Sequence, residues 1–223
     1  MIVVHHLNNS RSQRVLWLLE ELGLEYQIHA YQRDPKTMLA PPSLRAVHPL
    51  GKAPVITDGN LTLAESGAII EYIVTRYGAG RLSPPPDSLE YIRYIYWLHY
   101  AEGSAMPPLL MKLVFDNLHR APMPFFVRPL VKKIAAGARS AFVEPQLKLH
   151  LDYLEAELGN SDWFVGRTFS AADIQMSFPL EAAASRAGLD SSRPRLNNFL
   201  DRIHARPAYV RALERGGKYD LLK

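Results

Sequence analysis

Two amides and two hydroxyls lie close together near the start of the chain, in Asn8, Asn9, Ser10 and Ser12. They follow a short apolar run and precede a segment with helical spacing of apolar residues. The free N–H groups and the positive dipole end of a helix favour an anion, so this turn is suited to hold one. Side chains of these types are also the usual N-caps of helices, and simple capping is the alternative interpretation.

Two other short motifs have residues that could serve a ligand. Glu65 and Ser66 precede a further helical pattern, so a hydroxyl and free amides again lie at a helix start, where they can receive a carboxylate. Here too an N-cap is the alternative. The third motif places the cation Lys52, then Ala53 and Pro54, directly before a short apolar run. Pro54 has no N–H to donate, which leaves the chain before that run free to serve a ligand.

The composition bounds the classes of protein that could carry such sites. The chain has 223 residues, of which 48% are hydrophobic and 22% charged, as in ordinary globular proteins. It has no cysteine, which excludes disulfides, thiolate zinc sites, iron–sulfur ligation and a cysteine nucleophile. The start of the chain does not fit a signal peptide, and no apolar run reaches the roughly 18 residues of a membrane span, so a cytoplasmic protein is expected.

The formal net charge of +4 arises entirely after residue 79. Residues 1–79 contain seven basic and seven acidic side chains, whereas the remainder contains nineteen and fifteen. Between residues 111 and 140 the only acid is Asp116, and the bases are Lys112, Arg120, Arg128, Lys132, Lys133 and Arg139. A solvated helix face is one interpretation, and a basic rim that draws anions to a cleft is the other. This mild excess, without a groove-reading motif, does not favour nucleic acid as a partner.

The apolar spacing in residues 1–79 alternates between strand and helix patterns. It predicts strands over residues 2–6, 26–31, 55–57 and 61–63, and helices over 15–22, 43–47 and 69–77. Asp58, Gly59 and Asn60 have the residue types of a hairpin turn between the last two strands. The predicted order is β-α-β-α-β-β-α, with the three motifs at junctions between its elements.

Beyond residue 79 the pattern changes. Residues 80–86 contain three consecutive prolines and are expected to form a stiff, extended linker. No convincing strand follows, and helices are expected over 147–158, from Ser170 onward and over 197–204. Asp173 completes a capping box with Ser170, while Pro179 is expected to kink that helix or end it early. The expected organisation is a domain over residues 1–79, the linker over 80–86 and an all-helical domain over 87–223.

Taken together, these motifs resemble those of the glutathione transferases. The sequence has Ser-x-x-x-Arg at the first strand-to-helix turn, Pro-x-Gly-Lys-x-Pro before the third strand and Glu-Ser-Gly-Ala-Ile at the last helix of the first domain. The stretches 100–104 and 169–174 also look like the helical domain of this family, and the bacterial and fungal serine-type enzymes look nearest. The resemblance covers nearly the whole chain and implies a thioredoxin-like domain followed by the all-helical one.

The resemblance implies a role in binding glutathione for two of the motifs. Glu65 and Ser66 would hold the γ-glutamyl end, with the acid paired to its ammonium group and the hydroxyl to its carboxylate. Ala53, its geometry set by a cis bond to Pro54, would pair main chain to main chain with the cysteinyl unit. Lys52 would meet the glycyl carboxylate.

Ser10 would donate its O–H to the glutathione sulfur, with Ser12 and Asn9 as rivals for that role. A thiol with a pKa of about 8.5 is only about 3% ionised at pH 7, so a donor that favours the thiolate promotes its attack on an electrophilic carbon. The second substrate would lie between the domains, and the candidates for its apolar wall are Tyr96, Trp97, Tyr100 and Phe115. Ordinary helix packing is the alternative role for these four aromatic residues.

The implied function is conjugation of glutathione to small hydrophobic electrophiles by a homodimer. Glutathione is then a co-substrate, and no metal or bound cofactor is required. A glutathione-dependent disulfide or peroxide reductase that works without a cysteine nucleophile stays open as a second candidate. A non-catalytic binding module with the same fold is the third.

Overall fold

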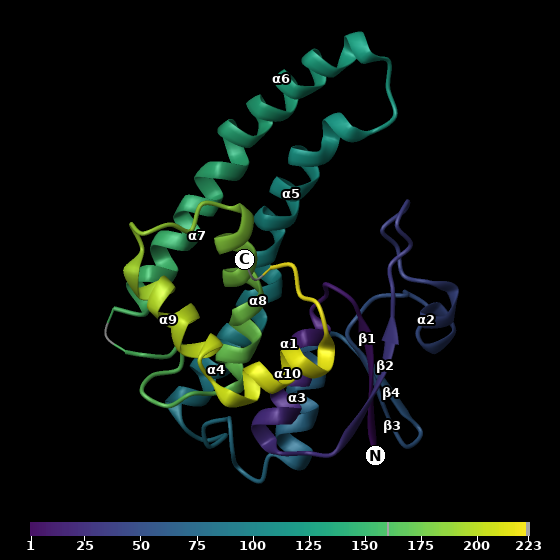
Figure 1. Ribbon diagram of the computed structural model, residues 1–223. Coiled ribbons are helices and arrows are strands. Elements are labelled where there is room, and N and C mark those ends of the chain that lie inside the picture. The colour runs from purple at the N-terminus through teal and green to yellow at the C-terminus, as the bar shows by residue number, and fades with distance from the viewer. Residues whose placement is uncertain (160, 222–223) are drawn as a thin grey trace.

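The computed structural model describes residues 1–159 and 161–221, and the chain begins with a small sheet flanked by helices (Figure 1). The elements of this part are β1 (Ile2–Leu7), α1 (Ser12–Leu22), β2 (Tyr26–Tyr31), α2 (Pro42–Val47), β3 (Val55–Asp58), β4 (Leu61–Ala64) and α3 (Ser66–Tyr77). The strand order is β2-β1-β3-β4, with β1 and β2 parallel and the other two pairs antiparallel. The predicted β-α-β-α-β-β-α order and the thioredoxin-like fold are confirmed.

The register of the sheet brings three loops to one of its ends. His5, near the end of β1, lies opposite Val55, the first residue of β3, and Val55 lies opposite Ala64, the last residue of β4. The chain after β1, the chain before β3 and the chain after β4 therefore leave the sheet at the same end. These are the three segments that carry the motifs.

Helix α1 is buried on all sides rather than on one face. Its residues from Ser12 to Leu19 are all buried, because β1, α3 and two helices of the second domain pack against it, α8 (Ala171–Arg186) and α10 (Pro207–Gly216). Gly23 ends the helix in the left-handed conformation at φ +63°, which glycine adopts without a Cβ penalty.

The described residues of the second part form helices joined by loops, with no strand apart from one isolated bridge between Trp163 and Gly166. Its helices are α4 (Leu89–Tyr100), α5 (Met106–Asn117), α6 (Arg128–Ala138), α7 (Glu144–Glu157), α8, α9 (Pro194–His204) and α10. π-helical turns at Ala101–Ala105 and Arg139–Val143 join α4 to α5 and α6 to α7. The all-helical second domain is confirmed, and none of the described helices is long and apolar enough to cross a membrane.

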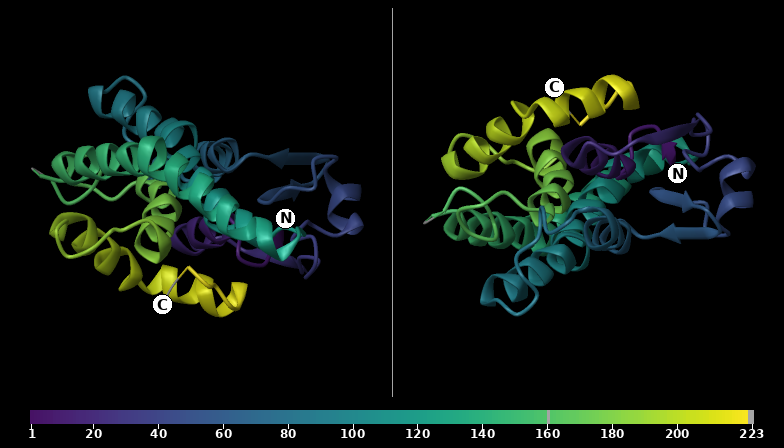
Figure 2. Two further views of the ribbon diagram at one scale, coloured as in Figure 1. Left: turned by 90° about the horizontal axis from the view of Figure 1, so that it is seen from above. Right: turned by 90° about the horizontal axis from the view of Figure 1, so that it is seen from below.

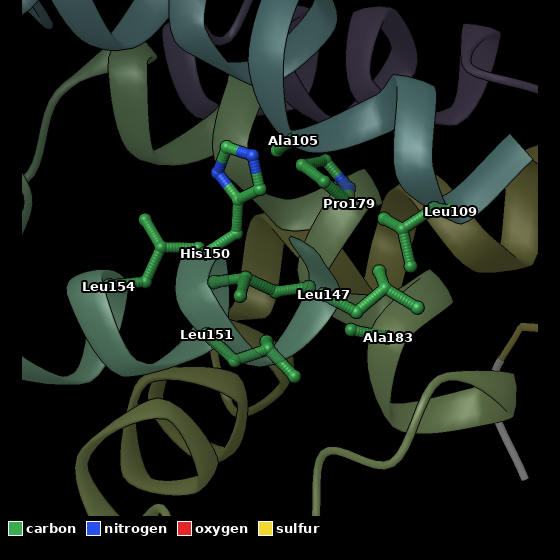
Figure 3. Close-up of a pocket in the computed structure, with 9 residues that line it drawn as sticks. Ala105, Leu109, Leu147, His150, Leu151, Leu154, Pro179 and Ala183 are labelled. Atoms are coloured by element: carbon green, nitrogen blue, oxygen red, sulfur yellow. The ribbon is translucent and has the colours of Figure 1, made fainter. Parts of the chain in front are cut away.

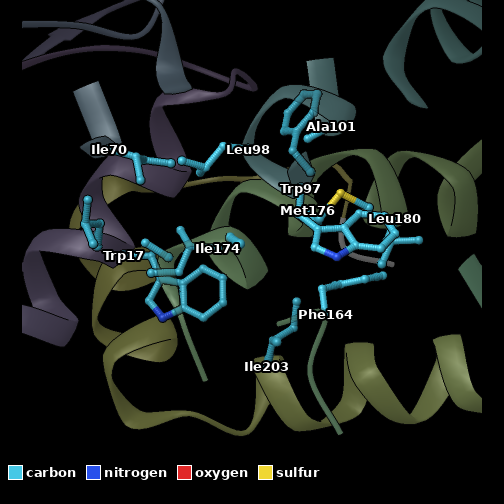
Figure 4. Packing of buried hydrophobic residues seen from close by; sticks show 14 of the residues in the cluster. Trp17, Ile70, Trp97, Leu98, Ala101, Phe164, Ile174, Met176, Leu180 and Ile203 are labelled. Atoms are coloured by element: carbon cyan, nitrogen blue, oxygen red, sulfur yellow. The ribbon is translucent and has the colours of Figure 1, made fainter. Parts of the chain in front are cut away.

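The segment between α3 and α4 contains residues 80–86. The exact boundaries 1–79, 80–86 and 87–223 stay a prediction, because the two domains share one hydrophobic core. Trp17 of α1 and Ile174 of α8 belong to the same buried cluster as Trp97 of α4 (Figure 4). Helix α10 also returns to lie along α1 (Figure 2), and Arg211 places its Nε 2.8 Å from a carboxylate oxygen of Glu20 there.

Pro179 does not end α8 early, contrary to one of the two expectations for it. The helix runs on to Arg186, and the residues from Ala171 to Ala183 are all buried. Their packing outweighs the roughly 3 kcal/mol that an interior proline costs a helix. The capping box of Ser170 and Asp173 at the start of α8 is present as predicted.

Candidate functional site

Ser10 lies just before α1, at the end of the sheet where the three loops meet, and is 5% exposed. Its Oγ accepts the backbone N–H of Ser12 at 3.2 Å and lies 2.7 Å from the Oγ of Ser12. The Oγ of Ser12 in turn lies 2.8 Å from Nδ1 of His6. A hydrogen-bonded chain, which we call the hydroxyl chain, therefore runs from His6 through Ser12 to Ser10.

The imidazole at the inner end of this chain is buried. Burial lowers the pKa of His6, and a hydrogen bond with the backbone of Gly216 opposes that effect without reversing it. The ring is therefore mainly neutral at pH 7 and carries a single proton, on either Nδ1 or Nε2. That proton decides whether Nδ1 donates to Ser12 or accepts from it.

The two rivals of Ser10 have their polar atoms engaged inside the protein. Ser12 is fully buried, with its hydroxyl between His6 and Ser10. Asn9 donates from Nδ2 to the carboxylate of Asp220 at 2.7 Å and accepts the backbone N–H of Asp220 at 2.8 Å. The Asn9 side chain is thus hydrogen-bonded to the C-terminal segment. Ser10 is the outermost group of the hydroxyl chain.

The second motif precedes β3 as the sequence predicts. The Ala53–Pro54 peptide bond is cis, and Val55 begins the strand directly after it. Pro54 is buried, Ala53 is half-buried and Lys52 is exposed. Lys52 and part of Ala53 are therefore within reach of solvent.

The third motif begins α3. Glu65 has a positive φ of +71°, a strained conformation for a residue with a Cβ, and its side chain is exposed. Ser66 is buried, and its Oγ accepts an N–H from Arg14 at 3.0 Å and another from Gln175 at 3.3 Å. Because two N–H groups donate to this oxygen, the O–H proton of Ser66 is left to donate to a ligand.

Arg14 is a functional candidate to which the sequence analysis gave no role. It is buried, and besides Ser66 it donates to the backbone carbonyl of Gln175 at 2.6 Å. That carbonyl lies four residues before Pro179, which has no N–H to offer it. Because of this proline, the carbonyl of Gln175 has no helical N–H partner and is free to accept a hydrogen bond from Arg14. The Ser-x-x-x-Arg motif is the only signal for Arg14 in the sequence.

Glu102 completes the partners of Arg14 and comes from the π-helical turn between α4 and α5. Its carboxylate lies 2.5 Å from Arg14 and 3.0 Å from Arg11. Burial raises the pKa of Glu102, but the two guanidinium groups lower it more, so the net pKa lies below its usual range. Single π-helical turns are frequent at functional sites. The sequence analysis noted residues 100–104 but assigned no role to this acid.

The aromatic residues predicted for the second substrate contact other helices. Tyr96 stacks on Tyr100 with ring centroids 5.6 Å apart, and the hydroxyl of Tyr100 is hydrogen-bonded to Nδ1 of His150 on α7 at 2.5 Å. Trp97 is fully buried in the shared core, and Phe115 is partly buried against it. These contacts are the helix packing that was the alternative role. A second-substrate role for Tyr96, Tyr100 and Phe115 stays a prediction.

A separate small pocket lies inside the helical domain, between α5, α7 and α8 (Figure 3). Its lining is apolar apart from His150, and it includes Leu109, Leu147 and Pro179. Burial lowers the pKa of His150, which favours the neutral ring. No three His, Cys, Asp or Glu side chains gather as a metal site anywhere in residues 1–159 and 161–221.

Comparison with known proteins agrees with this geometry. The models of the glutathione S-transferase N-terminal and C-terminal domains match residues 1–75 and 116–207. Glutathione S-transferase 3 of Schizosaccharomyces pombe is 40% identical over 183 residues, covering 82% of this chain and 74% of the relative. A disulfide-bond oxidoreductase of Escherichia coli is 27% identical over 221 residues, covering 96% and 94%. A crystal structure of a glutathione S-transferase from Actinobacillus pleuropneumoniae has a TM-score of 0.83 at 33% identity, covering 99% of this chain and 95% of that one. The chain therefore belongs to the glutathione S-transferase family.

Proposed function

We propose that this protein conjugates the thiolate of glutathione to small hydrophobic electrophiles, as a serine-type glutathione transferase. One observation carries the proposal: Ser10, Pro54 and Ser66 meet at the same end of the sheet, on loops set by the strand register. Three loops at one end can hold an extended peptide at both of its ends and at its middle.

The side chains of these loops fit the charges of glutathione. The exposed carboxylate of Glu65 suits the γ-glutamyl ammonium. The O–H of Ser66, whose oxygen already accepts from Arg14 and Gln175, suits the γ-glutamyl carboxylate. The exposed ammonium of Lys52 suits the glycyl carboxylate. Hydrogen bonds to charged groups contribute about 1.5–3 kcal/mol each, so the two ends of the peptide supply most of its affinity.

The sulfur would then lie at Ser10, before the N-terminus of α1. A hydroxyl donor and the positive end of a helix dipole both favour the thiolate over the thiol. In the neutral His6 ring the single proton faces the Gly216 backbone, so Nδ1 accepts from the Ser12 hydroxyl. The Oγ of Ser10 accepts the backbone N–H of Ser12, and its own O–H can turn toward the sulfur. Attack of this thiolate on an electrophilic carbon forms the carbon–sulfur bond and expels the leaving group.

Reduction of disulfides or peroxides is the second candidate, and the similarity to the Escherichia coli oxidoreductase favours it. The chain has no cysteine, so bound glutathione would supply the attacking thiolate in this reaction as well. The same Ser10 would stabilise that thiolate. The two activities therefore differ in the second substrate and share the glutathione site.

A calorimetric glutathione titration followed by two assays separates the candidates. We expect saturable binding and conjugation of a chloronitroaromatic compound. Reduction of hydroxyethyl disulfide without conjugation would favour the reductase instead. Absence of binding would overturn both proposals and favour a binding module.

We further propose that the protein is a homodimer of the cytoplasm. Its membership of the family supports this proposal. Fractionation of cells against compartment markers tests the location.

A further inference from the structure

The hairpin formed by α5 and α6 projects beyond the rest of the helical domain (Figure 1). Helix α6 packs mainly against α5 and the turns at its own two ends. The bend between the helices, residues 118–127, lies at the tip of the projection. It contains Phe125 and Phe126, with exposed fractions of 81% and 70%. Two phenylalanines are thus held in solvent at the outermost point of the fold.

Apolar side chains also stay exposed along both helices of this hairpin. Of the eighteen large hydrophobic residues that are exposed in the described chain, seven belong to it: Leu110, Val114, Leu118, Phe125, Phe126, Leu130 and Ile134. Leu110 and Val114 of α5 are four residues apart, as are Leu130 and Ile134 of α6, which is the spacing of one helix face. Such a concentration of exposed apolar side chains on one hairpin favours an interaction site, whereas single exposed hydrophobic residues are ordinary.

The hairpin is also cationic. Residues 117–143 contain no Asp or Glu. Lys112 and Arg139 form ion pairs with Asp116, and Arg139 also pairs with Glu144. Four further cations are exposed and belong to none of the ion pairs formed among the described residues: Arg120, Arg128, Lys132 and Lys133. The apolar tip is therefore flanked in the sequence by four cations that have no ion-pair partner among the described residues.

We propose that this hairpin binds the surface of an anionic lipid bilayer, with Phe125 and Phe126 inserted between headgroups and the four cations facing lipid phosphates. Exposed aromatic and aliphatic side chains beside Lys and Arg are the composition of interfacial membrane anchors. A second copy of the chain fits less well, because a two-fold contact would bring the same cations together, and residues 1–79 carry no net charge to complement them. The contact would hold the enzyme where hydrophobic electrophiles accumulate.

Vesicle co-sedimentation of the full chain tests this proposal. We expect binding to phosphatidylcholine vesicles that contain phosphatidylserine, weaker binding to pure phosphatidylcholine, and loss of binding as salt is raised. The variant Phe125→Ser/Phe126→Ser should bind at least roughly tenfold more weakly, because it removes the apolar insertion. The variant Lys132→Gln/Lys133→Gln should bind the anionic vesicles roughly fivefold more weakly for each cation removed. Its binding should also depend less steeply on salt.

The matched control is Leu149→Ser, which removes an exposed leucine from α7, outside the hairpin. It should leave vesicle binding unchanged, and the unaltered circular dichroism of all variants would show that each is folded. The proposal is overturned if the unmodified protein ignores anionic vesicles at low salt, or if Leu149→Ser weakens binding as much as the tip variant. It is also overturned if the tip variant converts a dimer into a monomer, since a second copy would then cover the tip. Glutathione binding enters none of these readouts, so they are independent of the proposed activity.

Discussion

At the scale of single residues, the hydroxyl chain sets the chemistry of the candidate site. If Ser10 donates to the sulfur, Ser10→Ala should raise the pKa of bound glutathione. The conjugation rate at pH 7 should fall about tenfold for each pKa unit, and alkaline buffer should restore part of it. Glutathione affinity should change little, because Lys52, Glu65 and Ser66 hold the peptide. The pH profile of the rate, measured beside a binding isotherm, checks both statements.

Ser12→Ala and Asn9→Ala are the controls for this experiment. Ser12→Ala breaks the hydroxyl chain behind Ser10, so we expect a smaller shift of the pH profile in the same direction. Asn9→Ala removes the two hydrogen bonds to Asp220 and should leave the pH profile of the rate unchanged. An unshifted profile for Ser10→Ala, with a shifted one for either control, would move the role to that neighbour. If all three variants keep the unshifted pH profile, the backbone N–H groups at the start of α1 stabilise the thiolate.

Ser66 is the residue on which glutathione affinity should depend most. Ser66→Ala removes a hydrogen bond to a charged group, so the dissociation constant should rise roughly tenfold to hundredfold. Ser170→Ala is the matched control, because it removes a helix-capping serine at the far domain and should cost about 1 kcal/mol of stability without changing affinity. Thermal melts and calorimetry of both variants supply the comparison. If Ser66→Ala behaves like Ser170→Ala, Ser66 only accepts from Arg14 and Gln175 and does not contact the ligand.

At the scale of elements, the proline inside α8 has a consequence for the site. Pro179→Ala would add an N–H that can bond to the carbonyl of Gln175 and compete with Arg14 for it. We expect the glutathione dissociation constant to rise about threefold, the value of one modest hydrogen bond. Arg14→Lys, which removes the forked donor, should weaken binding more. Equal affinity of Pro179→Ala and the unmodified protein, with weaker binding by Arg14→Lys, would show that the carbonyl serves both donors.

The turn between β3 and β4 is tied to α3 through Asp58. Its carboxylate accepts hydrogen bonds from the hydroxyls of Tyr77 and Tyr72 and lies 3.4 Å from the N-terminal ammonium. The bond from Tyr77 is the main cause that lowers the pKa of Asp58, with burial opposing it. A carboxyl whose pKa falls on folding stabilises the protein above its ordinary pKa, near 4, and loses that contribution as pH falls through the lowered value.

We therefore expect Asp58→Asn to be less stable than the unmodified protein by about 1 kcal/mol at pH 7. The difference should shrink below about pH 4, where the unmodified carboxyl becomes protonated. Denaturant unfolding at a series of pH values measures it. A deficit that stays constant down to pH 2 would contradict the assigned role of the charge.

At the scale of the whole molecule, we expect a dimer with an interface that includes α4. Leu89 and Ile92 of this helix are 80% and 66% exposed, one turn apart, and lie outside the hairpin proposed to bind lipid. Sedimentation at micromolar concentration should give twice the 25.2 kDa mass of the chain. Ile92→Glu should give the single-chain mass, since a charge buried in an interface is costly. A single-chain mass for the unmodified protein would count against the dimer.

The sequence by itself determined the elements of the first domain and the places of its motifs. Gly23 ends α1, the hairpin turn joins β3 to β4, and Ser170 and Asp173 form their capping box, all as expected. Each of these features depends on the backbone preferences and hydrogen bonds of residues a few positions apart. The family resemblance likewise follows from short motifs, and it implied the cis bond before Pro54.

Only the tertiary structure decided which partners those residues have. Arg14 and Gln175 are separated by 161 positions, and Asn9 and Asp220 by 211, so no local pattern connects them. The same holds for Pro179, whose position alone predicted a kink or an early end of the helix. The packing around α8 and the guanidinium of Arg14 come from elsewhere in the chain. Folding also placed His150 of α7 against the hydroxyl of Tyr100, a contact between residues 50 positions apart. Helical spacing fixes which residues share a face, whereas long-range packing fixes what that face meets.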